Sequence, residues 1–317
     1  MNALITSSLT PDQADASEQR SDGTTSSRRA GFYQTVSSGA LMLLWRRLFW
    51  QGLLWQRLLW QRQPALAAIA AVFLLAALPT SVAMQLDART VNEISIWVKP
   101  TKFLVSLSLF YATLAWNFGL LPASAQLTRA GRFIIWGSIG VGVAEMVWLL
   151  AAAVAGVPAH FNRQSFAWSV AYGSAGVGAT TLLVAMLWQA RMIAKNATNA
   201  VSPVLRAGVV VGAYTAFVMT LITAFVLAAG SGHWIGGPAS DASGLPLLGW
   251  ARNGGDLRVP HFFALHAQQF LPLAAWIVGD KLGWLSEARS VRVLAVLYVL
   301  FVMFTFVQAL HGVPFIS

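Results

Sequence analysis

The chain has 317 residues, of which 57 % are hydrophobic and only 10 % are charged. A soluble globular domain carries roughly 25 % charged residues, so this composition excludes an ordinary soluble protein and indicates a membrane protein. The formal net charge is +10, and no cysteine is present. Disulfides, thiolate metal sites and cysteine nucleophiles are therefore excluded, and any ligand has to be bound through nitrogen and oxygen atoms.

Seven apolar stretches are each long enough to cross a hydrocarbon core of about 30 Å, which takes about 20 residues. They must be helices, because lipid offers no partner for backbone polar groups. We therefore predict an all-α, polytopic membrane protein with seven transmembrane helices, at Ala65–Met84, Phe103–Leu121, Phe133–Ala155, Phe166–Trp188, Ala207–Ala229, Pro260–Gly279 and Val293–Leu310.

The basic residues predict the orientation of these helices. With the N-terminus in the cytoplasm, 15 of the 21 Lys and Arg residues fall on the cytoplasmic side. This bias follows the positive-inside rule, so we expect a cytoplasmic N-terminus and an outside C-terminus. The predicted partner of the positive charge is the lipid bilayer. A nucleic acid is therefore not needed to explain this charge.

The chain divides into three expected parts. Residues 1–33 are polar and lack apolar periodicity, which predicts a disordered cytoplasmic tail. Residues 34–63 contain four tryptophans at intervals of five, interleaved with arginines, which indicates an interfacial helix on the cytoplasmic leaflet. Two alternatives remain for this segment. It could be a basic leader that only fixes the topology, or it could contact a partner in a membrane complex. Residues 64–317 form the predicted transmembrane bundle.

A long glycine-rich loop at residues 230–259 joins the fifth and sixth predicted spans on the outer side. Loops of this length in a compact bundle are usually functional or disordered. The loop contains two tryptophans and several leucines that could be buried. It could therefore fold over the outer mouth as a lid, or remain a mobile linker.

All five histidines fall on the outer side of the predicted topology. Imidazoles from different helices suit zinc, copper or haem iron. A first hypothesis is therefore a metal ion or b-type haem, used in redox chemistry or metal handling, with His160, His266 and His311 as ligands. Against it, no two histidines have the spacing with which a single helix holds a metal.

Glu145 is the only acidic residue inside a predicted span, so its carboxylate has to find a partner or take up a proton. Candidate partners are His266, or a lysine or arginine that reaches in from the outer side. This pairing supports a second hypothesis, a proton-coupled transporter, channel or ligand sensor. His266 could equally be hydrogen-bonded within the bundle. A third hypothesis is a structural or assembly subunit of a membrane complex.

Several basic residues lie at the outer interface, against the positive-inside bias. Lys99 and Lys102 could extend to the outer headgroups, or they could ring the mouth of a site with Arg258 and attract an anion or a quinone-type carbonyl. Together these observations predict an outward-facing pocket that binds a small ligand or ion, lined by Glu145, His160, Asn162, His261, His266, Gln269, Lys99, Lys102 and Arg258. The residues do not specify whether the protein is an enzyme.

Three segments carry a likeness to a known group of proteins. They are W-x-K-P-x-K-F at Trp97–Phe103, H-F-N at His160–Asn162, and G-G-D-L-R-x-P-H-F-x-x-L-H-x-x-Q-x-L-P at Gly254–Pro272. With these segments the chain resembles a family of bacterial multi-pass inner-membrane proteins. The resemblance spans roughly residues 95–280, and it implies a shared membrane architecture but no particular reaction.

Overall fold

The computed structural model describes residues 58–317, except 164, 199, 247 and 282–287. Leu58–Ser317 form one compact unit. The predicted tail at 1–33 and most of the predicted interfacial helix, up to residue 57, lie outside the described residues. Of that helix, residues 58–62 are described and are helical.

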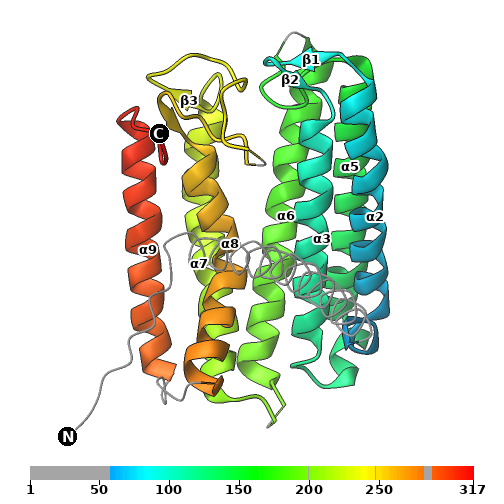
Figure 1. The fold of residues 1–317 in the computed structure, drawn as a ribbon. Coiled ribbons are helices and arrows are strands. Elements are labelled where there is room, and N and C mark those ends of the chain that lie inside the picture. Colours follow the sequence, from blue (N-terminus) through cyan, green and yellow to red (C-terminus); the bar gives the residue numbers. More distant parts are fainter. Residues whose placement is uncertain (1–57, 164, 199, 247, 282–287) are drawn as a thin grey trace, which may run out of the picture. The chain divides into compact units, whose positions relative to one another are not determined.

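The described residues are mostly helical, and the long helices lie side by side (Figure 1). The α-helices are α2 (Pro64–Leu86), α3 (Val98–Phe118), α4 (Arg129–Arg132), α5 (Ser138–Ala155), α6 (Phe166–Asn196), α7 (Pro203–Ala229), α8 (Arg258–Ala274) and α9 (Ala288–Leu310). A short 3-10 turn, η1 (Ala123–Leu127), lies between α3 and α4. Two π-helical segments also occur: η2 (Phe133–Gly137) joins α4 to α5, and η3 (Ala275–Lys281) extends α8.

Six helical segments in the described part of the chain are long and apolar enough to cross a membrane. They coincide with six of the seven predicted spans, so the prediction of an all-α, multi-pass membrane protein is confirmed to that extent. The segment predicted at Phe103–Leu121 is also a helix, α3, but it is not among the six. Its two lysines and its several hydroxyl side chains lower its apolar character.

Two short antiparallel ribbons lie at one end of the bundle, the upper end in Figure 1. We call it the hairpin end. β1 (Thr90–Val91) pairs with β2 (Ile94–Ser95) through a two-residue turn, Asn92–Glu93, in which both residues have positive φ angles, of 54° and 66°. Such φ values are typical of the tight turns that match strand twist. β3 (Trp234–Ile235) pairs with β4 (Gly255–Asp256) and closes the base of the long loop.

Apolar side chains fill the interior between α2, α3, α5 and α6 and continue to α7 and α8. Tyr111 of α3 is fully buried there, and its hydroxyl donates a hydrogen bond of 2.6 Å to the carbonyl of Ser138 on α5. Many large apolar side chains remain exposed on the outside of the helices, as expected for surfaces that face lipid, among them Leu75, Leu78, Val177, Val293, Leu300 and Phe304.

The closest helix packing occurs between α7 and α8. A Cβ atom added to Gly212 of α7 would lie 2.9 Å from the carbonyl oxygen of Ala267 and 3.1 Å from Cδ of Pro272. Gly208, one turn earlier, lies against Pro272 of α8 and Ala275 of η3. Small residues let helix backbones approach in lipid, so these glycines allow α7 to pack against α8 where Pro272 interrupts it.

We expect Gly212→Val to destabilise the protein by about 1–3 kcal/mol, because the new side chain overlaps the backbone of α8. Gly140→Val in α5 is the matched control, since a Cβ atom at Gly140 meets nothing within 4 Å. Thermal unfolding of the detergent-purified variants measures the difference. Equal loss of stability in both variants would contradict the close contact.

Candidate functional site

The long loop folds back onto the hairpin end of the bundle, and we call residues 230–257 the cap. Trp250 is only 6 % exposed and packs edge-on against Phe262 of α8 and Phe315 near the C-terminus. The backbone N–H of Leu257 donates to the carbonyl of His233, next to the β3–β4 pair. Of the two alternatives predicted for this loop, the structure therefore has the folded one.

A buried network of charges holds the cap together. The guanidinium group of Arg258 donates to Asp241 at 2.8 Å and to Asp256 at 2.7 Å, and Nε2 of His233 lies 3.0 Å from Asp241. Asp241 is 7 % and Asp256 1 % exposed. Burial raises the pKa of Asp241, but the hydrogen bond from His233 and the charge of Arg258 outweigh it, so this pKa lies below its ordinary value.

The cap is also bonded to the opposite half of the bundle. The backbone N–H of Asp241 donates to the carbonyl of Asn92 in the β1–β2 turn at 3.2 Å, and the Ser240 hydroxyl donates to Glu93. From α3, Lys102 donates to the carbonyl of Leu248 at 2.8 Å. Gly249 permits this approach, because it has a φ of 66° and a Cβ atom there would lie 2.8 Å from Nζ of Lys102.

Beneath the cap, Lys99, Glu145 and His160 form the centre of a polar cluster. Lys99 of α3 interacts electrostatically with Glu145 of α5, and with His160 in the α5–α6 loop. An added Cβ atom at Gly178 would lie 3.8 Å from the Glu145 carboxylate, which places that carboxylate against α6. Within the described part of the chain, neither Lys99 nor Glu145 makes a hydrogen bond or an ion pair within 4 Å.

His160 lies between two aromatic rings, with ring centroids 5.8 Å from Phe103 and 5.5 Å from Tyr172. Its Nδ1 atom is buried and has no hydrogen-bond partner. Burial, together with the neighbouring Lys99 and His261, lowers the pKa of His160 to about 3. His160 is therefore a neutral imidazole at physiological pH. One ring nitrogen can donate a hydrogen bond and the other can accept one.

Two further histidines extend the cluster along α8. Nδ1 of His261 lies 3.2 Å from the hydroxyl of Thr223 on α7. One and a half turns on, Nδ1 of His266 lies 3.2 Å from the Gln269 side-chain oxygen, and the Gln269 amide donates to Thr113 of α3 at 3.1 Å. This last bond joins α8 to α3 below the cluster.

The predicted site residues are thus placed as follows. Electrostatic interactions connect Lys99 with Glu145, His160 and Arg258, and connect His261 with both His160 and His266. Asn162 is 3 % exposed, two residues after His160. Lys102 and Arg258 belong to the cap contacts described above. Glu145 therefore lies beside Lys99, which was one of the two kinds of partner expected for it.

The predicted metal ligands are not brought together as a group. In the part of the chain that the structure describes, no three His, Asp or Glu side chains are arranged to hold a metal ion. His311 is exposed at the end of α9, whereas His160 and His266 belong to the polar cluster. The hypothesis of a metal or haem site gains no support from this arrangement.

Sequence reasoning did not single out the acidic partners of Arg258 or the hydroxyl partners of the histidines. Asp256 is two residues before Arg258, a spacing at which a carboxylate can accept both the backbone N–H and the guanidinium group, as it does here. That short-range signal was present in the sequence. Asp241, Thr113 and Thr223 carry no such signal, because each comes from a different part of the chain.

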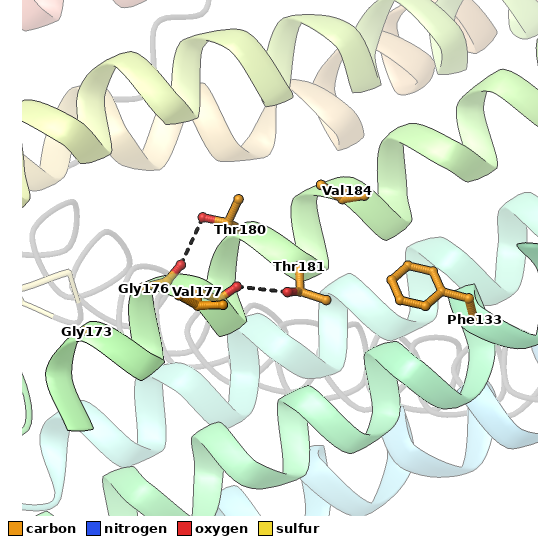
Figure 2. Close-up of a pocket in the computed structure, with 7 residues that line it drawn as sticks. All are labelled: Phe133, Gly173, Gly176, Val177, Thr180, Thr181 and Val184. Atoms are coloured by element: carbon orange, nitrogen blue, oxygen red, sulfur yellow. Dashed lines mark hydrogen bonds between the residues drawn. The ribbon is translucent and has the colours of Figure 1, made fainter. Parts of the chain in front are cut away.

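A separate hollow of about 550 Å³ lies on the outer surface of α6, beside Phe133. Figure 2 shows its lining, with the hydroxyls of Thr180 and Thr181 turned back to their own helix. They donate to the carbonyls of Gly176 and Val177, each at 2.9 Å. The hollow therefore presents a largely apolar surface, which suits contact with lipid chains.

Comparison of the chain with protein-family models, with curated proteins and with solved structures found no match. The function is therefore inferred from the side chains of the polar cluster.

The low pKa of His160 predicts an acid sensitivity. From pH 6.5, the ordinary pKa of histidine, down to about 3, the unfolded chain binds a proton that the folded chain does not, so stability falls as the pH falls. The contribution of His160 is up to about 1.4 kcal/mol per pH unit. In thermal unfolding at pH 7.5 and pH 5, His160→Gln should lose less stability than the wild type on acidification. The exposed-residue control, His311→Gln, should behave as the wild type; no difference between the two variants would contradict the prediction.

Proposed function

We propose that this integral membrane protein binds a small ligand from the outer side, in the polar cluster around Lys99, Glu145 and His160, and that a proton accompanies binding. The protein would act as a proton-coupled transporter, channel or ligand sensor. The supporting observation is that Lys99 and Glu145 lie within electrostatic range in the bundle and yet lack direct partners among the described residues.

Unpaired polar groups inside a bundle are costly. A buried donor or acceptor without a partner costs about 1–3 kcal/mol, and more when it is charged. The Nδ1 atom of His160 is such a group. Intramembrane ionisable residues commonly mark substrate or proton pathways. A ligand that bonds to Lys99 and His160 offsets these costs, which favours a binding role over a purely structural one.

We further propose seven membrane spans, with α3 as the seventh, in a bacterial inner membrane with the N-terminus in the cytoplasm. The length of α3 supports this, since 21 residues match the thickness of the hydrocarbon core. Its polar side chains have partners within the bundle, as Ser108 does with the carbonyl of Ala70. The hairpin end would then face outward, in agreement with the few basic residues there. This topology is the one predicted from the seven apolar stretches and the positive-inside rule.

Seven spans place the chain termini on opposite sides of the membrane, whereas six place them on the same side. The absence of cysteine allows a direct measurement with single-cysteine variants. In intact cells, a membrane-impermeant maleimide should label Ser317→Cys but should label Asn2→Cys only after the cells are opened. Labelling of both variants from the same side would reject the seventh span.

The binding site is tested by thermal unfolding of the purified full-length protein with acetate, methylammonium, glycine or a short-chain benzoquinone. These probes represent an anion, a cation, a zwitterion and a carbonyl ligand. At least one should raise the unfolding midpoint by a few degrees, and Glu145→Gln and Lys99→Met should abolish that rise. Lys195→Met, which removes an exposed lysine at the other end of α6, should retain it. Stabilisation that is unaffected by Glu145→Gln and Lys99→Met would reject this site.

A further inference from the structure

Two sets of charges at the hairpin end involve α3, and each set is neutral. The first set contains Arg258 and Lys102 with two carboxylates, Asp241 and Asp256. Arg258 is ion-paired with both carboxylates, and Lys102 interacts with them at longer range. Their charges cancel, and their hydrogen bonds are used in the cap. This set is therefore structural.

The second set is Lys99 and Glu145, whose charges also cancel but which do not touch. Each is close enough to feel the other electrostatically, yet no ion pair within 4 Å joins them in the described part of the chain. The titratable groups around them are His160 in the α5–α6 loop, Tyr172 of α6, which packs on His160, and His261 of α8. Arg258 and Asp241 of the first set also act electrostatically on Lys99, with opposite signs. The ammonium group of Lys99 and the carboxylate of Glu145 can therefore form hydrogen bonds with a ligand.

We propose, on the basis of the ligand site proposed above, that the cluster takes up a small monovalent anion of the carboxylate class together with one proton. The anion binds to the Lys99 ammonium group, and the proton, taken from the outer water, binds to the Glu145 carboxylate. No covalent bond is made or broken apart from the O–H bond on Glu145. The net charge of the set is zero before and after binding.

Neutrality is the physical reason for the coupling. An anion that entered alone would leave one uncompensated negative charge in a region of low dielectric constant, which is strongly unfavourable. Protonation of Glu145 removes that charge and frees Lys99 to pair with the anion. A cation would instead add to the positive charge of Lys99 and would leave an excess positive charge in the set.

The surroundings of Lys99 also favour an anion. Lys99 is the second residue of α3, and the residue before this helix, Trp97, supplies no side-chain cap. In the first turn of α3 the N–H groups of Val98 and Lys99 are left without helical partners and carry a partial positive charge, whereas the N–H of Thr101 donates to the carbonyl of Trp97. The buried Nδ1 atom of His160 adds a neutral group that can donate a hydrogen bond to a carboxylate oxygen.

The test is a titration of the detergent-purified full-length protein with acetate at pH 6, 7 and 8, in which the acetate concentration for half-maximal stabilisation is measured from thermal unfolding. One proton per anion predicts a value that rises tenfold for each pH unit. Acetamide and methylammonium, which match acetate in size but not in charge, should give no stabilisation.

Single substitutions distinguish the role of Glu145, which takes up the proton, from that of Lys99, which binds the anion. Glu145→Gln imitates the protonated carboxyl group, so it should bind acetate with a half-maximal concentration that no longer changes with pH. Lys99→Met should bind at least tenfold more weakly, whereas Lys99→Arg, which keeps the charge, should bind nearly as the wild type and shows that the position tolerates substitution. Lys195→Met should match the wild type.

Three results would overturn the proposal: a half-maximal acetate concentration that is independent of pH in the wild type, equal stabilisation by acetamide, or no stabilisation by acetate at all. If methylammonium, glycine or the quinone stabilises the protein through Lys99 and Glu145 instead, the anion is wrong and the ligand site remains. If no probe depends on these two residues, the site itself is wrong.

Discussion

The position of Arg258 between Asp241 and Asp256 is the interaction on which the hairpin end of this protein depends. Arg258 begins α8, Asp256 belongs to β4, and Asp241 lies in the middle of the cap. One guanidinium group therefore fixes three segments relative to each other. Because both carboxylates are buried, loss of the cation would leave two buried negative charges without their shared counter-charge, which is far more costly than loss of a surface ion pair. The cap can be an ordered structure, despite its many glycines, because this charge network holds it.

The polar cluster owes its location to the same arrangement. α3 contributes Lys99, α5 contributes Glu145 and the α5–α6 loop contributes His160, whereas α7 and α8 contribute Thr223 and His261. The cap covers the end where these helices meet, and it is bonded to α3 through Lys102 and to the β1–β2 turn through Asp241. Further into the bundle, the bond from Gln269 to Thr113 joins α3 and α8. Ionisable groups thus gather between the cap and the bond from Gln269 to Thr113.

Much of the helical framework could be predicted from the sequence, because lipid requires long apolar helices and these leave a clear signal in composition. The helix ends were less accurate. α6 continues to Asn196, two turns beyond the predicted Trp188, because Gln189 and Arg191 are good helix formers outside the apolar run. α7 begins at Pro203 after a Ser202 cap, a start signal that the apolar window did not use.

The site could be predicted only in part. The positive-inside bias and the position of Glu145 drew attention to Lys99 and His160, which interact electrostatically in the folded structure. The partners that depend on the folded cap could not be found, because a glycine-rich loop has no periodicity from which its fold can be read. The pairing of Asp241 with Arg258 and His233 is decided by tertiary contacts alone.

The bonds that join the cap to the other half of the bundle often end on backbone carbonyls. Lys102 bonds to the carbonyl of Leu248, and Asp241 donates its own N–H to the carbonyl of Asn92. A carbonyl is present whatever side chain the residue carries, so the acceptor positions are free to change during evolution, whereas the donating side chain of Lys102 is not. Leu248 should consequently vary widely among related chains, Lys102 should be retained, and Asn92 should be replaced mainly by residues that accept its left-handed backbone conformation, such as glycine and aspartate.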